Sequence, residues 1–115
     1  MTLLEKQILF PRLVAQLIQW LESNGYELTF GEAWRTPEMT KLYEQRGQGI
    51  SNSLHKIRLA IDINLFMQGK WLDKSEDYKA AGEYWESLST GVYRCCWGGR
   101  FGDGVHFSIE HQGVR

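Results

Sequence analysis

Two short segments, far apart in the chain, carry the side chains that could do chemistry. Residues 53–62 contain His55 and Asp62, and residues 97–107 contain His106. Two imidazoles and one carboxylate would leave a tetrahedral zinc ion with one open position. An open position distinguishes a catalytic zinc site from a structural one. These three residues are therefore candidate ligands of a catalytic zinc ion.

A carboxylate close to these ligands could act as the base. Asp103 precedes His106 by three residues and could accept a proton from water. Glu110 is a rival base, although it follows the histidine on the same predicted strand. A lone histidine is more often a surface residue than a ligand, and Asp62 could instead form an ion pair with Arg58.

The bulk properties of the chain bound the classes of protein it could be. Its 115 residues, 43% of them hydrophobic, predict one globular domain over residues 1–115. The net charge of −1 argues against a nucleic-acid partner. No apolar run reaches the roughly 18 residues that a membrane span needs, and no secretory signal is visible. The adjacent Cys95 and Cys96 indicate free thiols and a reducing compartment.

The first 25 residues read as a helix with clear ends. Thr2 and Glu5 form the pattern of a capping box, and Asn24-Gly25 supplies a stop. Pro11 lies inside this stretch, so the helix either kinks there or restarts with Pro11 in its first turn. The sequence leaves both possibilities open.

Two more helices and one strand follow from local signals. Residues 26–35 are predicted as a strand. A helix is predicted to start with Thr36 as its cap and Pro37 at its first position, and to run to about residue 46. Residues 75–88 are predicted as a further helix, acidic in its first turn and closed by Gly91.

Two strands with alternating patterns carry the candidate ligands. In residues 59–65 the apolar side chains share one face, and Asp62 lies on the other. In residues 105–109 the same alternation puts His106 opposite the apolar side. These patterns predict an α+β fold, in which a small antiparallel sheet carries the zinc site on one face and helices pack on the other.

The same segments resemble a known enzyme family. Ser53 to Asp62 is similar to the S-x-H-x-x-G-x-A-x-D signature of zinc D-alanyl-D-alanine carboxypeptidases and L-alanyl-D-glutamate endopeptidases. This family includes vancomycin-resistance-type D,D-peptidases and many phage endolysins. Residues 103–107 resemble its second signature, acid-x-x-H-F, and residues 97–101 resemble its W-G-G-x-F lead-in. The similarity extends from about residue 25 to residue 107.

The resemblance implies a role for individual residues. It implies zinc bound by His55, Asp62 and His106, with Asp103 as general base. Residues 32–36 resemble the family's G-Y-R-S segment, which implies that Arg35 holds a substrate carboxylate; the alternative is a surface arginine. Ser53 matches the motif serine, which is expected to form a hydrogen bond near the substrate.

The chain departs from the family pattern at three positions. Arg58 stands where the family usually has glycine, which could alter the approach to the metal. Asp103 replaces the commoner glutamate, so the base must sit closer to the water. Ser108 stands where H-F-E members have glutamate, so any support from that carboxylate is missing or supplied otherwise. None of these changes removes a ligand.

The resemblance implies a zinc peptidase that hydrolyses an amide bond of peptidoglycan stem peptides. We expect an L-alanyl-D-glutamate endopeptidase of a phage or prophage endolysin, with a D-alanyl-D-alanine carboxypeptidase as the alternative. The expected protein is a monomer, made in the host cytoplasm and acting on the cell wall after release. Two rivals are a non-catalytic zinc module of the virion or cell wall and a metallopeptidase of the same fold that cuts ordinary protein.

Overall fold

The computed structural model describes residues 1–49 and 53–115, and it begins with one long helix. Helix α1, Leu3–Ser23, starts at the predicted capping box of Thr2 and Glu5. It continues through Pro11, so it does not restart there. Asn24 is its C-cap, and Gly25 follows with φ of 83°, a left-handed conformation that glycine adopts without strain. Both predicted ends of this helix are confirmed.

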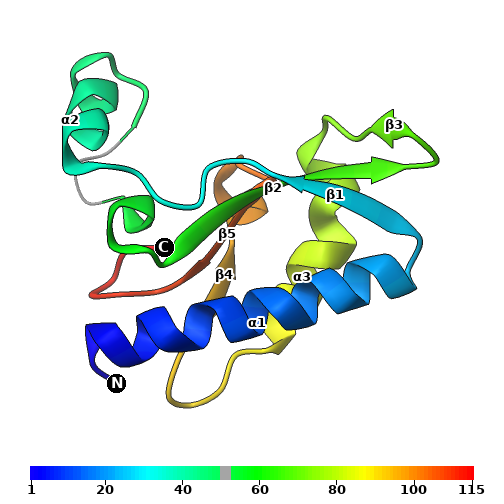
Figure 1. Ribbon diagram of the computed structural model, residues 1–115, viewed down its shortest axis with the longest axis horizontal. Coiled ribbons are helices and arrows are strands. Elements are labelled where there is room, and N and C mark those ends of the chain that lie inside the picture. The colour runs from blue at the N-terminus through cyan, green and yellow to red at the C-terminus, as the bar shows by residue number, and fades with distance from the viewer. Residues whose placement is uncertain (50–52) are drawn as a thin grey trace.

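A single antiparallel sheet forms the centre of the molecule (Figure 1). Its strands follow the order β1-β2-β5-β4, and the short β3 pairs with the far end of β2. The strands are β1 Tyr26–Phe30, β2 Ala60–Met67, β3 Lys70–Trp71, β4 Cys95–Trp97 and β5 His106–Ile109. Strands β2 and β5, which carry two candidate ligands, are therefore neighbours despite their separation in sequence.

The predicted strand over residues 26–35 is too long. Strand β1 ends at Phe30, and the chain then leaves the regular ladder. Gly31 donates a backbone hydrogen bond to the Asp62 carbonyl, whereas Arg35 donates to the His55 carbonyl. The segment after β1 therefore crosses from β2 to the turn that contains His55, and this crossing cannot be made by a straight strand.

The other two helices differ in how well the sequence predicted them. Helix α2, Pro37–Gln45, has Thr36 as its cap and Pro37 in its first turn, as predicted. The predicted helix over residues 75–88 is instead a short 3₁₀ turn, Ser75–Tyr78, followed by α3, Lys79–Ser87. The Tyr78 hydroxyl accepts from the Leu65 amide of β2 and donates to the Leu72 carbonyl, which fixes the first turn against the sheet. The helix ends before Gly91, which does not close it.

Helices α1 and α3 pack against one face of the sheet and enclose the hydrophobic core, whereas α2 stands apart from them (Figure 1). Trp85 of α3 is fully buried, and its indole N–H donates to the Ser108 carbonyl of β5. The helical contribution to the core comes from Phe10, Leu13, Val14, Leu17, Leu21, Ala81 and Trp85. The predicted α+β class is confirmed.

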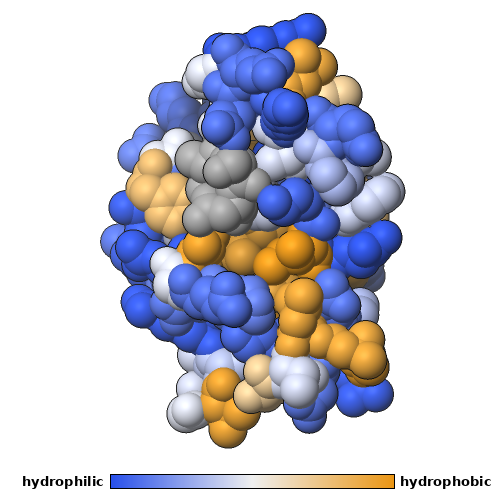
Figure 2. Space-filling view, turned by 90° about the vertical axis from the view of Figure 1, so that its left-hand side faces the viewer, coloured by the Kyte–Doolittle hydropathy of each residue, from blue (hydrophilic) through white to orange (hydrophobic). Residues whose placement is uncertain are grey.

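One face of the molecule is mainly hydrophilic (Figure 2). Its hydrophilic side chains flank an apolar area near the centre that continues towards the lower right, and smaller apolar areas lie near the edges. Among the described helices, none is both long and apolar enough to cross a membrane.

Candidate metal centre

Strand register brings two of the predicted ligands together. In the antiparallel β2–β5 pair, Asp62 lies directly opposite His106. Side chains of directly opposed residues leave the sheet on the same face, with their Cβ atoms about 5 Å apart. The neighbouring Ile61 and Ile63 point the other way and are buried in the core. The alternation that places these isoleucines in the core therefore also directs Asp62 and His106 to the open face.

A tight turn before β2 supplies the third side chain. His55 lies in a 3₁₀ turn, Leu54–Ile57, whose cap is the Ser53 hydroxyl, which accepts from the His55 amide at 3.3 Å. Arg58 ends the turn in the left-handed conformation with φ of 61°, which explains why glycine is the usual residue of the motif here. Its guanidinium stacks on Trp34, 4.4 Å from the ring centroid. None of the described ion pairs joins Arg58 to Asp62, so the alternative pairing is not seen.

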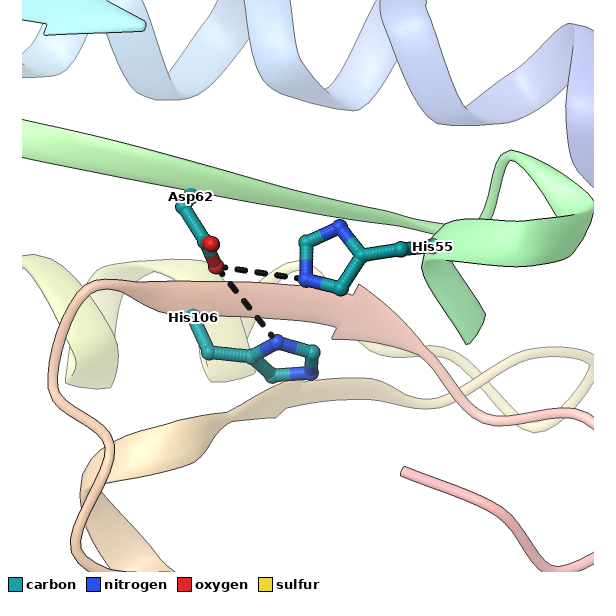
Figure 3. Close-up of side chains that lie close together, drawn as sticks. All are labelled: His55, Asp62 and His106. Atoms are coloured by element: carbon teal, nitrogen blue, oxygen red, sulfur yellow. Dashed lines mark ion pairs between the residues drawn. The ribbon is translucent and has the colours of Figure 1, made fainter. Parts of the chain in front are cut away.

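The three side chains converge on one point (Figure 3). Oδ1 of Asp62 lies 3.3 Å from Nε2 of His55 and 3.7 Å from Nδ1 of His106. One ligand atom from each residue falls within 4.8 Å of the other two. Both histidines are buried, with 4% of the residue exposed for His55 and 7% for His106. The structure thus brings together all three residues that the sequence singled out.

The arrangement fits a zinc ion on two counts. With metal–ligand bonds of about 2.1 Å, neighbouring ligand atoms of a tetrahedral site lie about 3.4 Å apart, and the two measured separations bracket that value. In addition, Oδ1 of Asp62 is fully buried and has no hydrogen-bond partner among the described residues. A buried carboxylate oxygen that accepts no hydrogen bond is costly, and a cation held between it and the two imidazoles that face it would satisfy it.

The charges around the cluster set the ionisation of its two aspartates. Burial opposes ionisation of Asp62, but the imidazoles of His106 and His55 outweigh it and lower the pKa of this carboxyl to about 2. Burial of its carboxyl group raises the pKa of Asp103 above the ordinary value, and the negative charge of Asp62 adds to this effect. Asp62 is therefore ionised at neutral pH, whereas Asp103 is the better proton acceptor of the two.

The glycine-rich loop between β4 and β5 positions Asp103. The Asp103 amide donates to the Gly98 carbonyl at 2.8 Å, and the Asp103 carbonyl accepts from the His106 amide at 3.1 Å. A Cβ on Gly98 would lie 2.2 Å from the Asp103 carbonyl oxygen, so only glycine fits. The indole N–H of Trp97 donates to the Gly104 carbonyl, and the Gly104 amide donates to the Ser75 hydroxyl. The loop is held on both sides of the predicted base.

Arg35 and Ser53 lie together next to the cluster. Nη1 of Arg35 donates to the Ser53 hydroxyl at 3.3 Å, and Nε donates to the Glu32 carboxylate at 2.6 Å. The guanidinium also stacks on Tyr43, 4.8 Å from the ring centroid. Arg35 is not the free surface arginine of the alternative interpretation, because its side chain is held in place beside the candidate ligands.

A single cleft of about 300 Å³ joins these groups. Its lining includes Arg35, Ser53, His55, Asp62, Asp103 and His106. Phe101, half exposed, also lines the cleft and packs edge-on against His106, with ring centroids 5.8 Å apart. Phe101 was not predicted as a substrate contact, and only its place in the W-G-G-x-F segment could have indicated it. Glu110, the rival base, is outside this lining.

A larger groove of about 420 Å³ lies between α1 and the residues at the end of β1 and the beginning of β2. Its lining is mostly apolar, with Phe10, Val14 and Phe30 among its residues. None of the predicted site residues faces it, so size alone does not identify the active site.

Comparison with known proteins agrees with this geometry. The family model for D-alanyl-D-alanine carboxypeptidase matches residues 46–109, more than half of the chain. No curated protein matches the sequence. Among solved structures, the Serratia marcescens L-Ala D-Glu endopeptidase ChiX superposes with a TM-score of 0.63. That match covers 87% of this chain and 79% of the other, at 19% sequence identity, and it establishes a shared fold.

The chain belongs to the D-alanyl-D-alanine carboxypeptidase family. The predicted family is therefore confirmed, and so is the predicted class of enzyme, a metallopeptidase that acts on peptidoglycan. The matched range contains the three candidate ligands and Asp103, while Arg35 lies before it.

Proposed function

We propose that this chain is a zinc-dependent L-alanyl-D-glutamate endopeptidase that cuts the stem peptide of peptidoglycan. The observation that carries the proposal is the convergence of His55, Asp62 and His106 in a cleft that also holds Arg35 and Asp103. The fold shared with the Serratia marcescens L-Ala D-Glu endopeptidase supports this choice of bond.

Each residue has a distinct task in the proposed reaction. His55, Asp62 and His106 would hold zinc, which supplies a Lewis acid and lowers the pKa of water that it binds. Asp103 would accept a proton from the attacking water and return it to the amine that leaves. The raised pKa of Asp103 makes it a stronger proton acceptor than an ordinary aspartate, and its protonated carboxyl can still donate to the leaving amine, which is far more basic.

Arg35 would bind the substrate carboxylate. Its planar guanidinium can grip a carboxylate with two hydrogen bonds, and its contacts with Ser53 and Tyr43 fix its orientation beforehand. A substrate held in this register presents the scissile amide to the base and the metal without further ordering. Phe101 at the lip of the cleft would pack against the peptide.

D-alanyl-D-alanine carboxypeptidase activity is the second candidate, and the matching family model carries that description. Both substrates place a carboxylate on the carbon that bears the scissile nitrogen. In the endopeptidase substrate it is the α-carboxylate of D-glutamate, and in the carboxypeptidase substrate it is the chain terminus. Arg35 could bind either one, so this contact alone does not choose between the two bonds.

Digestion of purified sacculi tests the choice. We expect mass spectrometry of the soluble products to show new peptides with an amino-terminal D-glutamate, and no release of free D-alanine. Free D-alanine as the sole product would refute the endopeptidase and favour the carboxypeptidase. A casein digest run in parallel tests action on ordinary protein, which we expect to be absent.

We further propose that the protein acts as a phage or prophage endolysin, as a monomer, and reaches the wall only after release from the cytoplasm. The resemblance of its motifs to those of phage endolysins supports this role. Cells that express the protein should lyse when the membrane is permeabilised and remain intact before that. Loss of lysis on chelation, restored by zinc, would exclude the rival role as a non-catalytic wall-binding module.

A further inference from the structure

Glu32 stands between two functional groups of the site. Its Oε1 accepts from Nε of Arg35 at 2.6 Å, and the same oxygen lies 3.8 Å from Nδ1 of His55. One carboxylate oxygen therefore faces both the guanidinium that would bind substrate and an imidazole that would bind zinc. No role for Glu32 was predicted from the sequence.

The backbone on either side of Glu32 is attached to two of the candidate ligands. The Glu32 carbonyl accepts from the Asp62 amide at 2.9 Å, while the Gly31 amide donates to the Asp62 carbonyl at 2.7 Å. The Arg35 amide donates to the His55 carbonyl at 3.1 Å. A Cβ on Gly31 would lie 3.0 Å from Cβ of Asp62, so this approach is close. The position of Glu32 is therefore fixed relative to both ligands.

The two nitrogens of His55 face different groups. Nε2 faces Asp62 and the point where the three ligands converge. Nδ1 is fully buried, and within residues 1–49 and 53–115 it has no hydrogen-bond partner. Its nearest recorded carboxylate is that of Glu32. Movement of about 1 Å would bring the two atoms to the 2.8 Å typical of a charge-assisted hydrogen bond.

We propose that Glu32 is a positioning residue for both halves of the site. Its carboxylate accepts Nδ1–H of His55, which directs Nε2 to the metal, and it accepts Nε–H of Arg35, which directs the rest of the guanidinium to the substrate. A histidine that binds metal is held best when its other nitrogen donates to a carboxylate. The inference rests on the proposed function, because it requires zinc at His55.

The test compares Glu32→Gln with a matched control, Glu27→Gln, on the exposed side of β1. Glutamine keeps the size of the side chain and an acceptor oxygen but loses the charge. We expect Glu32→Gln to raise the zinc dissociation constant about 10- to 100-fold, measured by competition with a chelator. We expect Glu27→Gln to leave it unchanged.

Two further measurements separate positioning from a merely structural role. In zinc-loaded wild type, the Nδ1–H proton of His55 should give a downfield, slowly exchanging NMR signal, which moves upfield in Glu32→Gln. With zinc at saturation, KM should rise in Glu32→Gln because Arg35 has lost its charged partner. If Glu32→Gln does not fold, Glu32→Asp is measured in the same way. Aspartate keeps the negative charge, but its side chain is one methylene shorter and does not reach His55 and Arg35 as glutamate does.

The outcomes distinguish the inference from the proposed function. Wild-type protein that binds no zinc overturns the proposed function and this inference with it. Wild type that binds zinc, together with a folded Glu32→Gln variant of equal zinc affinity and an unmoved Nδ1–H signal, overturns the role of Glu32 alone.

Discussion

Replacing Asp62 with asparagine tests whether two imidazoles flank this carboxylate in solution. The folded protein lowers the pKa of Asp62 to about 2 from the ordinary value of 3.8, because His106 and His55 outweigh the cost of its burial. A carboxyl whose pKa is lowered by folding stabilises the folded state at pH values above its pKa in the unfolded chain. This contribution is lost as pH falls from about 4 towards 2. Asparagine has no charge to lose, so the variant lacks this contribution at every pH.

The size of the effect follows from the shift. A difference of about 1.8 pKa units, at 1.36 kcal/mol for each unit, amounts to about 2 kcal/mol of stability. The Asp62 side chain is 26% exposed, so solvent screens the interaction only in part. Asp103 acts with the opposite sign, since its pKa is raised and its ionisation above that value costs stability. Wild type and Asp62→Asn both contain Asp103, so most of its effect cancels when their free energies of unfolding are subtracted.

Urea unfolding of the metal-free wild type and Asp62→Asn, from pH 7 down to pH 2, measures the difference. We expect the wild type to lose about 2 kcal/mol relative to the variant between pH 5 and pH 2. Glu83→Gln is the control. It removes an exposed ion pair with Lys79 at 3.8 Å, so the free energy of unfolding should change by a few tenths of a kcal/mol at most. A difference between wild type and Asp62→Asn that does not depend on pH would refute the reasoning.

Three more substitutions test the surroundings of the cluster. Asp103→Ala should lower kcat at least about 100-fold while the zinc content, measured by metal analysis, stays at that of wild type; near-normal turnover would remove Asp103 as the base. Gly98→Ala should abolish activity, because the added Cβ would lie 2.2 Å from the Asp103 carbonyl oxygen and 2.6 Å from Cβ of His106. The control is Gly91→Ala, whose Cβ would have no atom within 4 Å and which should have wild-type activity. Equal activity of the two variants would contradict the close contact at Gly98. Arg35→Lys should raise KM about tenfold with little change in kcat, because lysine cannot grip a carboxylate with two parallel bonds; an unchanged KM would argue against a substrate contact.

Local patterns predicted much of the fold because they reflect local physics. The alternation in residues 59–65 follows from the two-residue period of a strand, so it identified both β2 and the outward direction of Asp62. The caps at Thr2 and Thr36 satisfy free amides of a helix start, which is again a short-range requirement. These elements were therefore visible without any knowledge of tertiary structure.

Predictions failed where a distant contact overrode the local pattern. Residues 31–35 were predicted to continue the strand, and Gly31 and Glu32 still bond to Asp62 of β2. The Arg35 amide, however, bonds to the His55 carbonyl, which draws the end of the segment away from β2. Residues 75–78 have the composition of a helix start, but the Tyr78 hydroxyl is tied to the Leu65 amide and the Leu72 carbonyl. Neither contact leaves a trace in the periodicity of the sequence.

The candidate site shows the same division. Each ligand lies on the polar face of a recognisable element or within a motif, so His55, Asp62 and His106 were predictable as a set. Their convergence depends on the register between β2 and β5, which periodicity does not fix. Glu32 was missed because its importance comes only from its distances to Arg35 and His55 in the folded chain.

Anomalous diffraction at the zinc absorption edge, from crystals of the zinc-loaded protein, tests the metal centre most directly. We expect one strong peak in contact with a nitrogen of His55, a carboxylate oxygen of Asp62 and a nitrogen of His106, with its open side towards the cleft that Asp103 lines. A peak bound elsewhere, or no peak and three side chains that point to separate places, would contradict the zinc peptidase described above.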